Sequence, residues 1–378
     1  MAGIYIHVPF CRKKCHYCDF YRTTATEKKK DYLQALSREI DLRKDEMGTE
    51  PVETVYWGGG TPSVLTLENI AEVFEIIQRT FQLSENAEIT LEVNPDDVTP
   101  DYLSGLFRMG VNRLSIGIQS LNDRNLQLLN RRHSAAGAVG AVEQAFGAGF
   151  SNISIDLIYG IPGQTAEDWE NTLHQALKLP ANHLSAYHLT YHEGTLFHRW
   201  LGKGKIQELP EEESIRQFEQ LIKHTEQAGF EQYEISNFAR NRAYSRHNTA
   251  YWSGKNSLGL GPSAHSFNGL SRSWNVSGLG QYISAVLAGK PAITREFLSE
   301  TDQLNDYIIT RLRTKWGISL PEICEKYGAA VADQISGVVM KYEKQGWLAN
   351  RNGTVVLTTG GMLVSDQITR DLILDNDY

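Results

Sequence analysis

Short segments rich in β-branched and aromatic residues alternate with longer amphipathic segments along the first half of the chain. This alternation restricts the possible folds more than any other feature. The longer segments, such as 32–40 and 67–81, place apolar residues at spacings of three and four, which is typical of helices with one buried face. Repeated strand-helix units predict a parallel sheet covered by helices. The expected strands are 4–10, 52–57, 88–93, 113–119, 152–159 and 183–190.

Six such units predict an α/β fold with an incomplete (β/α)6 barrel, because a closed barrel of this kind needs eight units. Three short helical patterns, a hairpin with an Asn-Gly turn and a last helix predict a small winged-helix-like domain at the C-terminus. We therefore expect a barrel domain over 1–240, a connecting segment over 241–295 and the small domain over 296–378.

Charge and hydropathy exclude several classes of function. The formal charge is −8, and residues 296–378 hold 8 Lys or Arg against 12 Asp or Glu, so we expect no nucleic-acid partner in spite of the winged-helix pattern. The chain has no run of about 18 apolar residues and no signal-peptide pattern at its start. We expect a cytoplasmic protein without a transmembrane segment.

Three of the four cysteines lie within eight residues, directly after the first expected strand. Cys11, Cys15 and Cys18 can face one centre, and three thiolates around one centre indicate a metal or cluster site. A disulfide would leave one thiol unpaired and suits a cytosolic chain poorly. Cys324 lies apart in an amphipathic stretch, where we expect a buried small side chain.

Spacing alone leaves two kinds of metal site open. An iron–sulfur cluster held by three cysteines keeps one iron open to a small molecule. A structural zinc ion would need a fourth ligand, which His7 or His16 could supply. The spacing favours the cluster.

Polar groups recur where the later strands end. A glycine-rich turn follows the second strand, and three polar side chains interrupt otherwise apolar strands, where an unpaired polar group is costly. Each could equally be a satisfied structural group. Because parallel strands deliver their carboxyl ends to one barrel rim, we expect these groups to form one site. They are Gly59, Gly60 and Thr61 of the turn and Glu92, Gln119 and Asp156 of the strands, together with Arg131 from the Asn-Arg-Arg-His segment at 130–133.

The Cys-x-x-x-Cys-x-aromatic-Cys loop resembles that of the radical S-adenosylmethionine (SAM) superfamily. From residue 5 to about 266, the motifs Tyr-Ile-His-Val-Pro-Phe-Cys, Gly-Gly-Gly-Thr-Pro-Ser, Glu-Val-Asn-Pro and Ser-Ile-Gly-Ile-Gln-Ser are similar to those of the oxygen-independent coproporphyrinogen III oxidase family. The resemblance implies a 4Fe-4S cluster on Cys11, Cys15 and Cys18, with SAM bound at the open iron. The SAM contacts that it implies are Tyr5, Tyr17, Gly59, Gly60, Thr61, Glu92, Gln119, Arg131 and Asp156, with Thr190 and His265 as weaker candidates.

Two departures separate the chain from the oxidases. Phe20 stands where they carry a fourth cysteine, and four residues precede Tyr5 where they carry a longer N-terminal extension. Together with the His-Asn-x-x-Tyr-Trp element at 247–252, these departures resemble the HemW branch, whose members are haem chaperones. The branch implies haem as cargo and a haem-requiring acceptor protein such as a respiratory enzyme. It also implies an external electron donor if SAM is cleaved.

The sequence leaves other functions open. One alternative is oxidative decarboxylation of coproporphyrinogen III to protoporphyrinogen IX, and another is a zinc-bound structural protein without turnover. Whether the chain is an enzyme stays open, and no catalytic residue is assigned. His247 is a candidate axial ligand for haem iron, with Tyr251 and Trp252 as flat apolar surface beside it. Alternatively, this element is a hydrogen-bonded turn that anchors the C-terminal domain.

Overall fold

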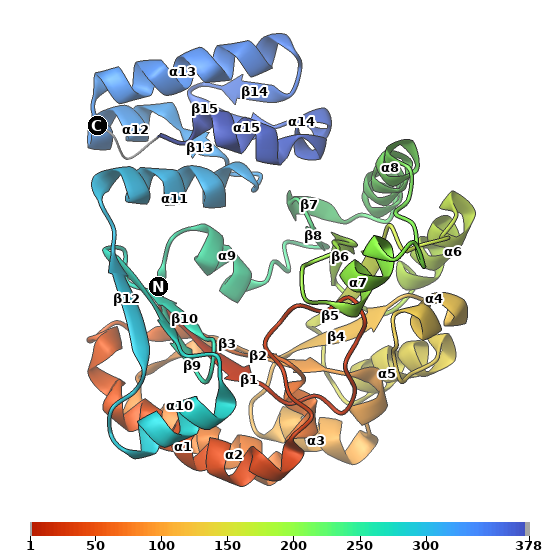
Figure 1. The fold of residues 1–378 in the computed structure, drawn as a ribbon, viewed down its shortest axis with the longest axis vertical. Coiled ribbons are helices and arrows are strands. Elements are labelled where there is room, and N and C mark those ends of the chain that lie inside the picture. The colour runs from red at the N-terminus through yellow and green to blue at the C-terminus, as the bar shows by residue number, and fades with distance from the viewer. Residues whose placement is uncertain (1, 375–378) are drawn as a thin grey trace.

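The computed structural model describes residues 2–374 and has a curved, open sheet at its centre (Figure 1). The six expected parallel strands are all present, and each pairs with the next along the chain. The sheet continues past them at both ends, so the prediction of an incomplete barrel is confirmed. The six strands are β1 (Ala2–Val8), β2 (Val52–Gly59), β3 (Leu83–Val93), β4 (Arg113–Gln119), β5 (Ile153–Tyr159) and β6 (His183–His188).

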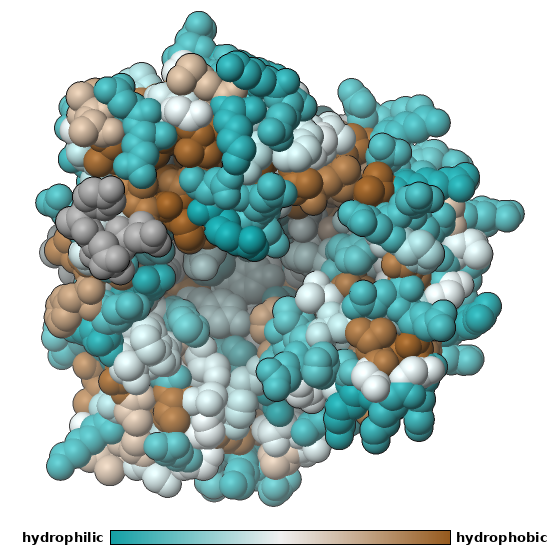
Figure 2. Space-filling view, turned by 45° about the horizontal axis from the view of Figure 1, so that its top comes forward, coloured by the Kyte–Doolittle hydropathy of each residue, from teal (hydrophilic) through white to brown (hydrophobic). Residues whose placement is uncertain are grey.

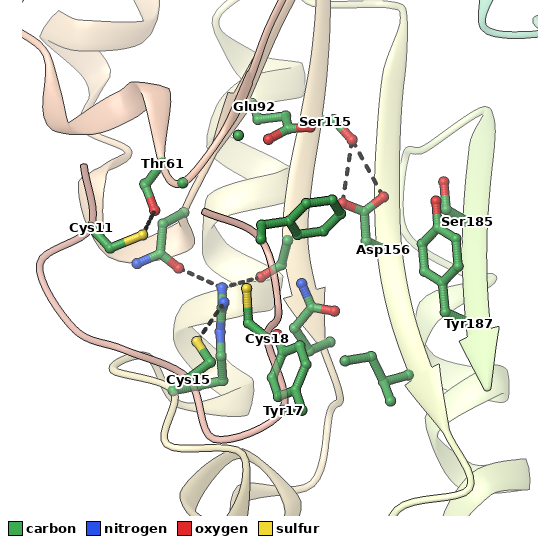
Figure 3. Close-up of a pocket in the computed structure, with 18 of the residues that line it drawn as sticks. Cys11, Cys15, Tyr17, Cys18, Thr61, Glu92, Ser115, Asp156, Ser185 and Tyr187 are labelled. Atoms are coloured by element: carbon green, nitrogen blue, oxygen red, sulfur yellow. Dashed lines mark hydrogen bonds between the residues drawn. The ribbon is translucent and has the colours of Figure 1, made fainter. Parts of the chain in front are cut away.

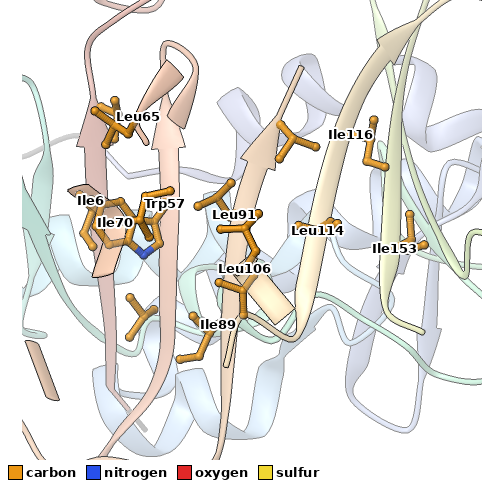
Figure 4. Close-up of a cluster of buried hydrophobic side chains, with 14 of the residues drawn as sticks. Ile6, Trp57, Leu65, Ile70, Ile89, Leu91, Leu106, Leu114, Ile116 and Ile153 are labelled. Carbon is orange, nitrogen blue, oxygen red and sulfur yellow. The ribbon is translucent and has the colours of Figure 1, made fainter. Parts of the chain in front are cut away.

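Amphipathic helices cover the outer face of these strands (Figure 1). Threonine caps fix where two of them begin, since Thr66 and Thr165 each form a capping box. Apolar side chains of successive strands, among them Ile6, Trp57 and Leu91, pack against the helices in the main core (Figure 4). The helices are α1 (Lys29–Leu42), α2 (Leu67–Thr80), α3 (Pro100–Arg108), α4 (Asp123–Leu128), α5 (Ala135–Gly147) and α6 (Ala166–Ala176).

Further strands extend the sheet to twelve within the described residues. β7 (Glu231–Glu234) and β8 (Asn237–Ala239) form a hairpin beside β6. Segment 241–295, which the sequence predicts to be a connection, places β9 in parallel with β1 at the other side of the barrel. The strands there are β9 (Asn256–Leu260), β10 (His265–Phe267), β11 (Ser271–Asn275) and β12 (Ile293–Phe297).

The remaining barrel helices follow β6 or lie between the later strands. They are α7 (Leu196–Gly202), α8 (Glu211–Gln227), α9 (Arg246–Trp252) and α10 (Leu279–Leu287). Short 3-10 turns are η1 (Thr26–Lys28), η2 (Lys44–Met47), η3 (Pro62–Val64) and η4 (Pro95–Asp97). None of the helices formed by residues 2–374 combines the length and apolar character needed to span a bilayer.

The C-terminal part of the chain has a second hydrophobic core and shows the expected three helices followed by a hairpin. Cys324 is exposed rather than buried, because the neighbouring Ile323 takes the inward position of its helix. The domain limits given above remain predictions. The elements are α11 (Glu300–Leu312), β13 (Ile318–Ser319), α12 (Leu320–Tyr327), α13 (Ala329–Lys344), β14 (Leu348–Arg351), β15 (Thr354–Leu357), α14 (Thr359–Leu363) and α15 (Ser365–Leu372).

Candidate functional site

The carboxyl ends of the six parallel strands open into a cavity of about 530 Å³. Figure 2 shows the molecule hollowed in the middle of one face, with hydrophilic residues around much of the opening. Most of the predicted site residues meet in this cavity, whereas Tyr5, His247 and His265 are outside its lining. Those that line it are Cys11, Cys15, Tyr17, Cys18, Gly59, Gly60, Thr61, Glu92, Gln119, Arg131, Asp156 and Thr190.

The cysteine loop is closed at its base by backbone hydrogen bonds. The amide of Cys11 donates to the carbonyl of Thr23 at 2.9 Å, and the amide of Thr23 donates to the carbonyl of Pro9 at 2.7 Å. All three thiols are free and line the cavity (Figure 3). Burial raises the pKa of Cys11, and it raises the pKa of Cys18 to about 11. Because the thiolate is the form that binds metals, metal binding would release the protons of Cys11 and Cys18.

The distances between the three sulfur atoms indicate whether they fit one zinc ion or a cluster of several iron ions. Among residues 2–374, the three sulfurs do not all come within 4.8 Å of one another. In a tetrahedral zinc site, Zn–S bonds of about 2.3 Å separate the sulfurs by only about 3.8 Å. Among the same residues, neither His7 nor His16 belongs to a group of three or more ligand atoms that converge within 4.8 Å. The donor set thus fits a cluster of several iron ions better than one zinc ion.

The glycine turn after β2 packs directly against the cysteine loop. A Cβ at Gly60 would lie 2.8 Å from the carbonyl oxygen of Phe10 and 3.1 Å from Cys11 Sγ. Gly59 has a φ of 110°, which favours glycine. Thr61 Oγ1 lies 3.4 Å from Cys11 Sγ, so this turn brings backbone and hydroxyl groups beside the first thiol.

Two carboxyl groups face the cavity away from the thiols (Figure 3). Glu92 accepts a hydrogen bond from the Tyr56 hydroxyl at 2.9 Å, and Asp156 accepts one from Ser115 at 3.3 Å. Burial and the charge of Asp156 raise the pKa of Glu92 to about 8, and burial raises the pKa of Asp156 to about 6. Such a pair suits a ligand that carries a cationic group and hydroxyl donors.

Arg131 connects the cysteine loop to the ends of β3 and β4. Its Nη2 donates to Asn94 Oδ1 and to the carbonyl of Gly117, both at 2.7 Å, while Nη1 lies 3.5 Å from Cys15 Sγ. Nearby, Gln119 ends β4 with a φ of 62°, an uncommon conformation for a residue with a side chain. The guanidinium is thus held in place before any ligand binds.

Sequence reasoning missed several residues that complete the cavity. Tyr56, Asn94, Ser115, Ser185 and Tyr187 all line it. The strand pattern could have identified some of them, because residues two apart on a strand face the same side of the sheet as a candidate site residue on that strand. In the sheet register, Asp156 lies opposite Ser185 on the neighbouring strand.

His247 lies behind Tyr56, outside the lining of the cavity. Its ring stacks on that of Tyr56 at 4.9 Å between centroids, and its Nδ1 lies 2.8 Å from the hydroxyl oxygen of Thr54. Glu88 accepts hydrogen bonds from the backbone amides of Arg246 and His247, which fixes the start of α9. Burial lowers the pKa of His247 to about 4, so its imidazole is neutral near pH 7.

Tyr251 and Trp252, the two aromatic residues at the end of α9, lie in different surroundings. The Tyr251 side chain is exposed. The Trp252 ring lies under the guanidinium of Arg313, at 4.5 Å from its centroid, and Arg313 also pairs with Glu234 at 2.6 Å. These contacts join α9 to the C-terminal elements, as the anchoring alternative expects.

Phe20, the residue that departs from the oxidase pattern, lies at the edge of the cavity with 65% of its surface exposed. Its side chain has no metal-ligating atom. Of the two weaker candidates, Thr190 lines the cavity, whereas the ring of His265 stacks on Trp274.

Comparisons with known proteins agree with this geometry. The family model described as the radical SAM superfamily matches residues 5–176, and that described as the HemN C-terminal domain matches residues 298–364. The Bacillus subtilis protein named heme chaperone HemW is 34% identical over 371 residues, which cover 97% of this chain and 98% of the relative. A Mycobacterium tuberculosis protein of the same name is 33% identical, with 98% of this chain and 94% of the relative covered.

A solved structure is also similar over almost the whole chain. It is coproporphyrinogen III oxidase from Escherichia coli, described as a radical SAM enzyme. The TM-score is 0.86 at 27% sequence identity, and the match covers 98% of this chain and 90% of the oxidase. The two proteins therefore share their overall architecture.

Proposed function

The chain belongs to the HemW family of radical SAM proteins, and on this premise we propose that it is a haem chaperone that binds haem and delivers it to a haem-dependent protein. The observation that carries the proposal is the match, from end to end, to relatives named heme chaperones. The three-thiol cavity supports the cofactors expected of this family.

We infer that the cavity holds a 4Fe-4S cluster and SAM. Cys11, Cys15 and Cys18 would bind the cluster, whose reduced form supplies the electron for cleavage of SAM when both are bound. Such cleavage would need an external electron donor. Glu92, oriented by Tyr56, would bind the ammonium group of SAM, whose positive charge favours the ionised form of the carboxyl group. The other SAM contacts would come from Tyr17, Gly59, Gly60, Thr61, Gln119, Arg131 and Asp156.

We propose that His247 binds haem iron through Nε2. Neutral imidazole is the form that ligates iron, and a hydrogen bond at the other ring nitrogen is the usual way to orient a ligating histidine. The contact of Nδ1 with Thr54 supplies that arrangement. Haem titration of His247→Ala should then show an altered haem spectrum and weaker binding.

The exposed His198 on α7 offers a matched control, because His198→Ala removes an imidazole without touching α9. Equal haem spectra and affinities in the wild type and His247→Ala would remove His247 from the proposal. A lower melting temperature of His247→Ala with unchanged haem binding would indicate the anchoring role instead.

The structural similarity to the oxidase favours one alternative, oxidative decarboxylation of coproporphyrinogen III. Phe20 argues against this oxidase activity, because its side chain has no ligand atom and it occupies the position of the fourth cysteine that the resemblance gives to the oxidases. The deciding experiment is anaerobic reconstitution with iron and sulfide, followed by haem transfer to an apo-protein with and without SAM. Transfer supports the chaperone, whereas protoporphyrinogen formed from coproporphyrinogen III without haem transfer would establish the oxidase.

A further inference from the structure

A second group of metal-ligating side chains lies on the outside of the barrel, between α6 and α8. These helices pack against each other at the edge of the molecule (Figure 1). Glu170 and His174 come from α6, and His224 comes from α8. Within residues 2–374 this is the one group of three or more His, Cys, Asp or Glu whose ligand atoms all lie within 4.8 Å of one another.

The helix geometry explains why these residues converge. Glu170 and His174 are four residues apart on α6, so they project from one face of that helix. The same i, i+4 spacing brings two ligands to one ion in helical zinc sites. His224 approaches from the facing helix, with its Nε2 at 3.0 Å from Glu170 Oε1. The rings of His174 and His224 lie 4.7 Å apart between centroids, at 82° to each other.

We infer that Glu170, His174 and His224 form a binding site for a zinc ion, separate from the cysteine loop. Two imidazoles and one carboxylate are donors that zinc prefers, and three protein ligands leave a fourth position for water or a small anion. Bonds of about 2.0–2.1 Å would set neighbouring ligand atoms about 3.3 Å apart, close to the present His224–Glu170 distance.

Burial differs among the three ligands in a way that suits an accessible ion. The His224 side chain is 9% exposed and that of Glu170 is 41% exposed, while His174 lies at the surface. The buried imidazole is therefore held by packing, and the exposed ligands can close on an ion that arrives from solvent. A simple hydrogen bond between His224 and Glu170 would not explain why His174 also converges on the same point.

The bound ion would connect two helices that already share a buried hydrogen-bond network. Trp169 Nε1 donates to the carbonyl of Gln217 at 2.9 Å, which joins α6 to α8. Gln217 Oε1 in turn accepts from the amide of Gly160, just beyond β5, the strand that carries Asp156. We therefore infer that the zinc ion would hold α6 and α8 together behind β5, which forms part of the cavity wall.

Metal uptake by the cluster-loaded full chain tests the site, because the three loop thiols are then already ligated. The titration uses the Cys324→Ser background, because Cys324 is a free and exposed thiol. Anaerobic titration with Co²⁺ should show one cobalt ion per chain, with visible absorption of a tetrahedral nitrogen–oxygen site and no thiolate-to-cobalt band. Zinc should displace it. His174→Ala should weaken binding at least tenfold, and because His174 is exposed, this change should leave the fold intact.

Glu170→Gln provides a second variant that keeps the side-chain shape, and it should also weaken binding. His198→Ala is the matched control and should bind as the wild type does. Zinc should raise the melting temperature of the wild type and of His198→Ala, but not that of His174→Ala. Equal uptake by His174→Ala and the wild type, a thiolate-to-cobalt band, or no uptake at micromolar metal would overturn the inference.

Discussion

The imidazole of His247 stacks on the phenol ring of Tyr56, whose hydroxyl donates to Glu92 inside the cavity. Tyr56 thus separates the candidate haem ligand from the candidate SAM site and touches both. A change at Tyr56 can therefore affect the two sites differently.

Tyr56→Phe removes the hydroxyl and keeps the ring that packs on His247. Because a hydrogen bond to an ionised group contributes about 1.5–3 kcal/mol, we expect SAM affinity to fall about tenfold or more. Haem binding should change little. Equilibrium dialysis of SAM and haem titration measure the two effects, and Tyr327→Phe on α12 is a control that should leave both unchanged. Full SAM affinity in Tyr56→Phe would contradict the role of Tyr56 in orienting Glu92.

Cys18→Ser should prevent stable assembly of the cluster, because the cluster would lose one of its three thiolates. Iron and sulfide content and the visible absorbance after anaerobic reconstitution measure this loss. Cys324→Ser is the matched control, since Cys324 is exposed and lies in the C-terminal elements. Equal cluster content in both variants would exclude Cys18 as a ligand.

Glu92 makes the stability of the ligand-free protein depend on pH. Burial raises its pKa to about 8 from an ordinary value of about 4.5, so the folded state holds this proton more tightly than the unfolded state. The resulting stability is complete below about pH 4.5 and is lost as the pH rises through about 8. The raised pKa of Asp156 acts in the same direction at lower pH.

Glu92→Gln should therefore flatten the upper part of this profile. Between pH 5 and pH 8.5 we expect the wild type to lose about 4 kcal/mol of unfolding free energy relative to Glu92→Gln. Urea unfolding at several pH values measures the difference. Glu212→Gln, at an exposed position of α8, should follow the wild-type profile. Parallel profiles for the wild type and Glu92→Gln would show that Glu92 is ionised throughout.

Gly60→Ala should destabilise the turn that follows β2 and packs against the cysteine loop. The added Cβ would meet two backbone carbonyl oxygens at 2.8 and 3.0 Å, so we expect a loss of about 1–3 kcal/mol and poorer cluster retention. Gly147→Ala is the control, because no atom outside its immediate surroundings lies within 4 Å of the added Cβ. Thermal unfolding compares the two variants, and equal melting temperatures would refute the steric argument.

The sequence by itself determined those features that depend on residues close together in the chain. The strand-helix alternation follows from local periodicity, and each of the six parallel strands overlaps the range that this periodicity predicts, although β1 ends at Val8 and β3 begins at Leu83. The three cysteines share one loop, so their common role could be inferred without knowing the fold. The cofactors, by contrast, were inferred from the resemblance to a family, because spacing alone left zinc open.

Only the tertiary structure decided which distant residues meet. It paired β9 with β1, placed Tyr56 between His247 and Glu92, and brought His224 of α8 to Glu170 of α6. The tertiary structure also leaves Cys324 exposed, because adjacent residues of a helix point about 100° apart and Ile323 is the residue that faces the core. Such contacts depend on packing between segments far apart in the chain, which local periodicity does not encode.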